Sequence, residues 1–375
     1  MNKYSAEYFA KSFYDEHNFP LAYQKGMSCE ERENWKQALT DKIRELMAFP
    51  KTMYEEPKVH LLLSKKQENY RIEKYEMSPE PNLWITFFLM VPDFASEKHQ
   101  TPGVLCLPGT GWTKEALCGE DFCDLDYDPP QPITGIGHRY YYANTQALHY
   151  VKNGMTAIAC EDIGVGEHAG ESLDVNDIEK LLIGQGRSIM GVTVEIRLAL
   201  LKWLKKLPFV DRNRIAISGH SLGVDSAMHV VLLDTDVKAF VYNDFICDTQ
   251  QRISTICPPE HFYPICWHMY PGIYRWYSYP DLLAAYAPRK LFITEGGMTE
   301  HLERLAEVYA EYGALENFRY DYYREYSAPE NRKHDHEPLP KGLTHAEYFE
   351  FANVNPEKHF FKFEAAIPWL KDALK

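Results

Sequence analysis

Arg214-Ile-Ala-Ile-Ser-Gly-His-Ser-Leu-Gly-Val-Asp-Ser-Ala-Met-His-Val-Val231 is the stretch of sequence that decides the fold. Its two apolar runs, before and after a short glycine-containing segment, predict a strand that turns abruptly into a helix. The segment, Gly219 to Gly223, has the G-x-S-x-G pattern of a nucleophile elbow, in which the central residue has a strained backbone and the glycines let strand and helix pass closely. We therefore predict that Ser221 is a nucleophile above the sheet and that the Leu222 amide faces a developing oxyanion.

Length and composition bound the class of protein. The 375 residues fit either two domains or one large α/β domain with additions. Hydrophobic residues make up 45% and charged residues 25%, which are the values of a globular protein. The formal net charge of −14 disfavours nucleic acid and anionic membranes as partners, because both require a basic face.

The start of the chain and its cysteines bear on location and cofactors. The chain has no apolar run of transmembrane length, and its first residues lack the apolar core of a secretory signal, so we expect a cytoplasmic protein. The eight cysteines form no C-x-x-C pair of the zinc or redox kind. His334-Asp-His336-Glu lies in a charged stretch typical of a solvated loop. We therefore expect no metal and no cofactor.

The pattern along the chain predicts a helical extension followed by alternating strands and helices. Residues 1–60 form the extension, in which Ser28-Cys-Glu-Glu31 is a capping box before a helix, and residues 61–375 form the catalytic domain. The expected strands are 70–76, 83–91, 103–107, 154–160, the elbow strand from 214, 237–242, 290–294 and 318–323. This alternation implies an α/β fold with a mostly parallel central sheet, helices on both faces and the first two strands as an antiparallel edge.

An aromatic-rich insert follows the sixth expected strand, from about residue 245 to residue 280. It contains Trp267, Tyr270, Tyr274, Trp276, Tyr277 and Tyr279 without clear helical or strand periodicity. Because open α/β sheets bind ligands at the carboxyl ends of their strands, the insert is either an aromatic wall over the site or a self-packed loop. On the first interpretation, Trp267 and Tyr270 contact the substrate.

The order of these features resembles that of the α/β-hydrolases, in particular the dienelactone hydrolase-like and acetyl xylan esterase-like bacterial hydrolases with an N-terminal helical extension. The stretches that carry the resemblance are the Trp35 helix, Pro102 to Gly111, the elbow, Leu282 to Gly297 with Ala287-Pro-Arg289, Asn355 to Lys362 and Pro368-Trp-Leu370. The resemblance implies a serine-acid-histidine triad in that chain order. Dienelactone hydrolases use cysteine, so Ser221 favours the esterase-like members.

The base of the triad must come from late in the chain, since a serine hydroxyl is a poor nucleophile until a base takes its proton. His359 follows the last expected strand and precedes a short terminal helix, where the resemblance also places the base. His334, His336 and His345, in the stretch between that strand and that helix, are the alternatives.

The acid of the triad has several candidates. In the family pattern an aspartate stands a few residues past a glycine after the penultimate strand, but in Thr294-Glu-Gly-Gly-Met-Thr-Glu300 that place falls on Thr299. Glu300 is adjacent and Glu295 lies at the strand end, so either can orient the histidine. Asp244, after the preceding strand, is a third candidate.

The second donor of the oxyanion hole is expected in the turn after the strand that ends at Leu107. The resemblance implies that the Thr110 amide pairs with that of Leu222. Relatives commonly have histidine at the position of Pro108, which changes the local hydrogen bonding. Trp112, just beyond, either lines the acyl pocket or fills a gap.

These residues together predict a serine carboxylic-ester hydrolase that acts through an acyl-enzyme on an acylated carbohydrate or another small ester. A serine peptidase is an alternative, because the same triad cleaves amides. A non-catalytic binding protein of the same fold is the other, motivated by the open choice of acid and by Pro108. The sequence leaves open whether the chain forms a homo-oligomer.

Overall fold

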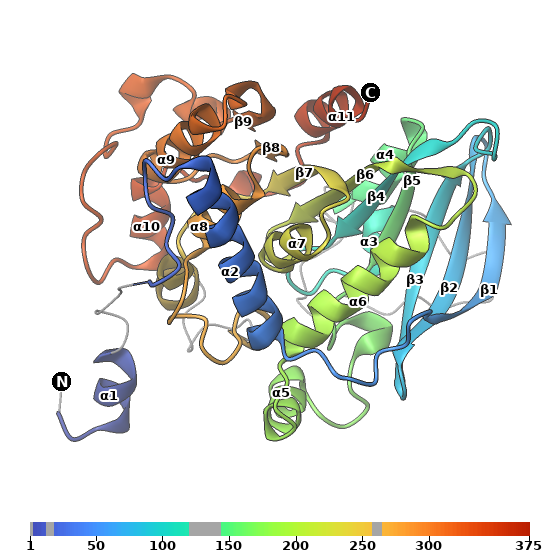
Figure 1. Cartoon of the computed structure of the whole chain (residues 1–375), viewed down its shortest axis with the longest axis horizontal. Helices are drawn as coiled ribbons and strands as arrows, with labels where there is room; N and C mark the ends of the chain where they lie inside the picture. The colour runs from blue at the N-terminus through green and yellow to red at the C-terminus, as the bar shows by residue number, and fades with distance from the viewer. Residues whose placement is uncertain (1–2, 13–18, 120–143, 257–264) are drawn as a thin grey trace.

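The computed structural model describes residues 3–12, 19–119, 144–256 and 265–375, which build an α/β fold around one sheet (Figure 1). In this part of the chain the sheet has nine strands in the order β1-β2-β3-β5-β4-β6-β7-β8-β9. The strands are β1 (Lys58–Lys66), β2 (Tyr70–Glu80), β3 (Leu83–Pro92), β4 (Thr101–Leu107), β5 (Thr156–Cys160), β6 (Val210–His220), β7 (Val237–Asn243), β8 (Lys290–Ile293) and β9 (Phe318–Tyr320).

Helices cover both faces of this sheet. They are α1 (Ala6–Ser12), α2 (Cys29–Met47), α3 (Lys114–Cys118), α4 (Gln146–Lys152), α5 (Val175–Gly184), α6 (Ile189–Leu204), α7 (Leu222–Leu233), α8 (Tyr279–Tyr286), α9 (Thr299–Glu311), α10 (His345–Phe351) and α11 (Phe363–Ala373). The larger apolar core lies between the sheet and α2, α6, α7, α8 and α9. A second core lies between the opposite face and α3, α4 and α11. Within the described residues, no helix is both long and apolar enough to cross a membrane.

The topology confirms the predicted fold class. The strands from β5 through β4, β6, β7 and β8 to β9 pair in parallel, whereas β1, β2 and β3 form an antiparallel edge that joins β5. Helix α6 directly precedes the elbow strand β6 in the chain. The connection between the expected strands 70–76 and 83–91 is shorter than predicted, because β2 continues through a register shift to Glu80. Only residue 81 and the left-handed Asn82 (φ 67°) complete the turn.

The edge strand β1 was not predicted. Its sequence Lys58-Val-His-Leu-Leu-Leu-Ser-Lys-Lys66 does not alternate between apolar and polar residues. This matches an irregularity between Leu61 and Leu63 at which the pairing register changes. Leu61 and Leu62 are therefore both exposed. The strand spans the boundary that the sequence placed at residue 60, so the N-terminal extension continues directly into the sheet.

Helix α2 anchors the N-terminal extension to the rest of the protein. Its capping box is present, with the Ser28 hydroxyl accepting from the Glu31 amide at 3.2 Å and the Glu31 carboxylate accepting from the Ser28 amide at 2.7 Å. One face of the helix, from Trp35 to Met47, is buried against α6 and α7 (Figure 1). The extension therefore contributes to the main apolar core.

Shortening Leu39 of α2 should destabilise the whole protein. Leu39 is fully buried, so Leu39→Ala removes apolar contacts and leaves a cavity, which costs about 2–5 kcal/mol of unfolding free energy. Urea denaturation followed by circular dichroism measures this loss, and Asn34→Ala on the exposed face of the same helix is the control. An unchanged main transition in Leu39→Ala would mean that the extension unfolds independently.

Candidate active site

Ser221 lies between β6 and α7 in the geometry of a nucleophile elbow. Its backbone has φ 51° and ψ −122°, a conformation that is costly for any residue with a side chain. The Ser221 amide donates to the carbonyl of Asn243 on β7 at 3.1 Å, which holds the turn against the sheet. Ser221 is partly exposed, whereas His220 and Leu222 on either side are buried. The turn thus presents one accessible hydroxyl.

The two glycines of the pentapeptide are required by close contact. A Cβ atom on Gly219 would lie 2.9 Å from the carbonyl carbon of Gly223, where strand and helix cross. A Cβ atom on Gly223 would lie 2.7 Å from the carbonyl oxygen of Leu107, at the end of β4. Larger residues at either position would therefore push α7 away from the sheet.

The turn after β4 packs directly on the elbow. A Cβ atom on Gly109 would lie 3.3 Å from the Cβ of Ser221, so the backbone of this turn passes beside the serine side chain. Leu222 is the first residue of α7, and its amide consequently has no acceptor within the helix. Thr110, the other predicted donor, is partly exposed in the neighbouring turn. Both predicted oxyanion donors therefore belong to segments that meet at Ser221.

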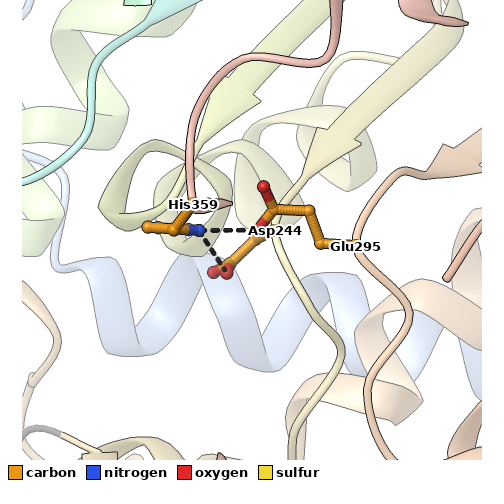
Figure 2. A group of neighbouring side chains, drawn as sticks. All are labelled: Asp244, Glu295 and His359. Atoms are coloured by element: carbon orange, nitrogen blue, oxygen red, sulfur yellow. Dashed lines mark hydrogen bonds and ion pairs between the residues drawn. The ribbon is translucent and has the colours of Figure 1, made fainter. Parts of the chain in front are cut away.

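His359 and Glu295 form the central hydrogen bond of the site. The His359 Nδ1–H group donates to Oε2 of Glu295 at 2.5 Å (Figure 2). Glu295 lies two residues past the end of β8 and its side chain is fully buried, whereas the side chain of His359 is 23% exposed. The His359 ring lies 4.6 Å, between centroids, from the ring of His220, the residue before the candidate nucleophile. The predicted base therefore reaches the elbow with its Nδ1 held by a carboxylate.

The Glu295 carboxylate has two further partners. The Tyr323 hydroxyl donates to Oε2 at 2.8 Å, and the Lys362 ammonium lies 2.7 Å from Oε1. Burial by itself would raise the pKa of Glu295, but His359 and Lys362 outweigh it and lower this pKa to about 2. Glu295 is therefore ionised at neutral pH and accepts hydrogen bonds only.

Asp244 also faces His359, from the end of β7. Its Oδ1 lies 4.0 Å from the same Nδ1 and accepts from the Phe245 amide at 2.8 Å (Figure 2). Its Oδ2 accepts from Arg252 at 2.5 Å. Burial raises the pKa of Asp244, although Arg252 and His359 oppose the rise. Asp244 thus pairs primarily with Arg252, and Glu295 is the carboxylate hydrogen-bonded to the imidazole.

The other predicted triad candidates lie elsewhere. Glu300 is exposed in the first turn of α9, where the charged groups that act on its carboxylate are His336, Asp248, Asp335 and Glu303. His334 pairs with Glu337 at 2.8 Å, and the exposed His345 lies on α10 against Phe349. The geometry therefore brings Ser221, Glu295 and His359 to one end of the sheet and leaves these alternatives in the segment beyond β8.

The predicted substrate-binding aromatics are largely buried. Tyr270 is part of the main core, and its hydroxyl is bonded to His229 Nε2 and to the Tyr277 hydroxyl, each at 2.9 Å. Trp267 is buried in the same apolar cluster as Leu222 and donates to the Ile163 carbonyl at 2.8 Å. The self-packed interpretation of the insert fits these residues, because long-range contacts satisfy their polar atoms. Residues 257–264 of the insert lie outside the described part of the chain.

Trp112, the third predicted aromatic contact, also lies at the site. Its side chain is 5% exposed, and its amide donates to the Gly109 carbonyl at 3.1 Å. A Cβ atom on Gly109 would lie 3.4 Å from its ring, so Trp112 supports the turn that borders Ser221.

Asn243 is a residue of the site that sequence reasoning missed. Its Oδ1 accepts from the Thr294 hydroxyl at 3.0 Å and from the Lys362 amide at 2.8 Å, and its Nδ2 donates to the Phe360 carbonyl at 3.1 Å. This side chain therefore ties the end of β8 and the His359 loop to β7. A polar residue at the end of a buried strand is the signal that could have identified it, as it identifies the neighbouring Asp244.

Asp244, Glu295 and His359 also have the donor types of a metal site, with one ligand atom from each within 4.8 Å of the others. The arrangement favours hydrogen bonding instead. His359 Nδ1–H donates to Glu295 Oε2 at 2.5 Å, so this nitrogen has no lone pair for a metal, and the Lys362 ammonium and Arg252 guanidinium lie against the two carboxylates. Two resident cations leave little electrostatic attraction for a metal ion.

Replacing the acid should distinguish the three predicted carboxylates. Glu295→Gln keeps the size of the side chain but removes the charge that stabilises the His359 imidazolium, and should lower kcat/KM for an ester by about 10²–10⁴-fold. Asp244→Asn should cost less, because Asp244 does not make the short bond, and Glu300→Gln should be near wild type. Steady-state kinetics on the three folded variants measures the order. Full activity of Glu295→Gln would move the acid to Asp244.

The chain is an α/β-hydrolase, as three features indicate: the sheet order, the strained turn at Ser221 and the buried Glu295 carboxylate that is hydrogen-bonded to His359. The model of the Abhydrolase family matches residues 5–372, and the chain belongs to this esterase-like family.

Solved structures agree with this family. A Bacteroides fragilis protein, provisionally assigned as an acetyl xylan esterase, is 32% identical with a TM-score of 0.85, over 99% of this chain and 95% of that one. A glucuronoyl esterase from Solibacter usitatus shares the fold at 14% identity and a TM-score of 0.55, over 80% of this chain and 86% of its own. A methylesterase also shares the fold, at 16% identity and a TM-score of 0.55, over 88% of this chain and 66% of its own. No curated protein matches the chain.

Proposed function

We propose that this protein is a serine carboxylic-ester hydrolase. The observation that carries the proposal is the His359–Glu295 hydrogen bond beside the strained, accessible Ser221. In this mechanism the Ser221 hydroxyl attacks the ester carbonyl while His359 takes its proton, and Glu295 holds the imidazole in the tautomer with Nδ1 protonated. The Leu222 and Thr110 amides stabilise the oxyanion.

The second half of the proposed reaction returns the enzyme to its starting state. His359 gives the proton to the departing alkoxide, which leaves as an alcohol and leaves an acyl group on Ser221. A water molecule, deprotonated by His359, then attacks the acyl carbonyl. The bond to the Ser221 oxygen breaks, this oxygen takes the proton back from His359, and the carboxylic acid is released. The exposed portion of His359 is consistent with entry of that water.

An acylated carbohydrate is the substrate class that we propose. Its support is the assignment of the Bacteroides fragilis protein, which is similar to this chain over nearly its whole length. A glucuronoyl esterase and a methylesterase are among the more distant structures, and they carry no more than the fold to this chain.

A substrate panel tests the proposal. The purified protein should release nitrophenol from 4-nitrophenyl acetate and acetate from acetylated xylo-oligosaccharides, and should leave a peptide 4-nitroanilide uncleaved. Cleavage of the anilide with little ester turnover would support the peptidase alternative. If a fluorophosphonate fails to label Ser221 and no ester is cleaved, the protein is a non-catalytic member of the fold.

A further inference from the structure

Two carboxylates face one nitrogen of the candidate base. Glu295 Oε2 lies 2.5 Å and Asp244 Oδ1 lies 4.0 Å from His359 Nδ1, on the same side of the ring (Figure 2). Both carboxylates are buried, where opposite charges stabilise an imidazolium strongly. Two uncompensated negative charges would keep His359 protonated, and a protonated histidine cannot accept the proton of Ser221.

Each of these carboxylates has a cation beside it. The Lys362 ammonium lies 2.7 Å from Glu295 Oε1, on the oxygen that His359 does not use. The Arg252 guanidinium donates to Asp244 Oδ2 at 2.5 Å, again on the oxygen farther from the imidazole contact. The two carboxylates that face His359 are therefore each offset by a cation, although Arg252 also lies 3.8 Å from Asp225, which is itself bonded to His268 at 2.5 Å.

The Lys362 ammonium is held in place by several groups. The Lys362 amide donates to Asn243 Oδ1 at 2.8 Å, and the ammonium donates to the carbonyls of Phe360, at 3.0 Å, and of Lys358. It lies 3.9 Å from the centroid of the Phe360 ring. The side chain is 19% exposed, so its charge is only partly screened by water. This lysine is thus built into the site.

We propose that Lys362 and Arg252 are positioning residues, each of which holds and neutralises one of the two carboxylates that face His359, so that the imidazole is free to act as a base. The inference rests on the proposed function and deepens it, because it assigns how the base is kept in its working protonation state. Neither residue belongs to the serine, acid and base that the fold itself requires.

The direction of the effect on His359 follows from its surroundings. The titratable groups that face it from the packed elements are His220 of β6, Asp244 after β7, Glu295 after β8, Tyr323 after β9 and Lys362 of its own loop. Burial lowers the pKa of His359, the two carboxylates outweigh burial and raise this pKa above its ordinary value, and Lys362 acts against them. Removing the Lys362 charge therefore raises the pKa of His359 further.

The pH dependence of kcat/KM in Lys362→Met tests the proposal. The acid limb should move to higher pH by about one unit, with activity at pH 6 reduced several-fold and activity at pH 9 nearly unchanged. Lys362→Arg should restore the wild-type limb, because it returns the charge. Lys371→Met, which removes an exposed lysine of α11, is the matched control. A uniform loss at every pH, or an unshifted limb, would contradict the proposal.

A second measurement does not depend on turnover. Nuclear magnetic resonance of protein labelled at histidine follows the titration of His359, assigned by its absence in His359→Gln, and the pKa should rise in Lys362→Met. If wild type cleaves no ester, the proposed function fails while this titration still decides the role of Lys362. An equal His359 titration in wild type and Lys362→Met overturns the inference. Lys362→Gln serves if circular dichroism shows that the methionine variant does not fold.

Discussion

Ser221→Ala should lower kcat/KM for 4-nitrophenyl acetate by at least about a thousandfold while the protein stays folded. The reason is that the reaction has no other nucleophile at this turn, because His220 and Leu222 on either side are buried. Alanine retains the Cβ atom and hence the strained backbone, so the turn and its neighbours are not expected to rearrange. The residual rate comes from the oxyanion donors and substrate binding alone.

The measurement for Ser221→Ala combines kinetics with mass spectrometry. Wild type treated with a fluorophosphonate should gain the mass of one phosphonyl group at Ser221, and the variant should gain none. Ser64→Ala, on the exposed edge strand β1, should behave as wild type in both assays. Equal rates above background for wild type and Ser221→Ala would exclude the acyl-enzyme mechanism.

His359→Ala should have an effect of similar size, a loss of about 10³–10⁴-fold in kcat/KM. Without the imidazole, no group at the elbow takes the serine proton. The neighbouring His220 is a weak base, because its burial and, to a smaller extent, the charge of the nearby His359 lower its pKa to about 3. Such a weak base accepts little of the proton in the transition state. Kinetics at saturating and limiting ester separates this effect from substrate binding.

The three alternative histidines supply the controls for this result. His334→Ala, His336→Ala and His345→Ala should remain within a few-fold of wild type, because these residues lie on the segment beyond β9 with carboxylate or aromatic neighbours of their own. A thousandfold loss in one of them, together with near-normal activity of His359→Ala, would reassign the base to that segment.

The fold class and the elbow were predictable because both depend on local pattern. Gly219 and Gly223 are needed for contacts within a few residues and with one adjacent strand, and apolar runs mark the strands of a sheet covered on both faces. The edge strand β1 escaped prediction because the register irregularity between Leu61 and Leu63 interrupts the alternation on which strand prediction relies.

The position of Glu295 beside His359 was not predictable from spacing alone. Glu295 and Glu300 follow the same strand, and the choice depends on Gly296 and Gly297, whose φ angles of 65° and 110° turn the chain sharply away. A Cβ atom on Gly297 would lie 2.3 Å from the Ile246 carbonyl oxygen, so the turn is set by a segment distant in sequence. The exposed position of Glu300 follows from that turn.

The burial of Tyr270 likewise depends on distant contacts. Its hydrogen bond to His229 joins the insert to α7, and no periodicity within the insert reports such a pairing. The cations Lys362 and Arg252 were missed for a related reason, because each is recognisable only once the carboxylate it faces is known.

The bonds that Asn243 makes to the loop around His359 have a consequence for how the enzyme is made. During synthesis Ser221 emerges from the ribosome long before His359, and the segment with the base must then dock on a strand end that already exists. A nascent chain therefore presents the Ser221 turn before His359 is available to dock beside it.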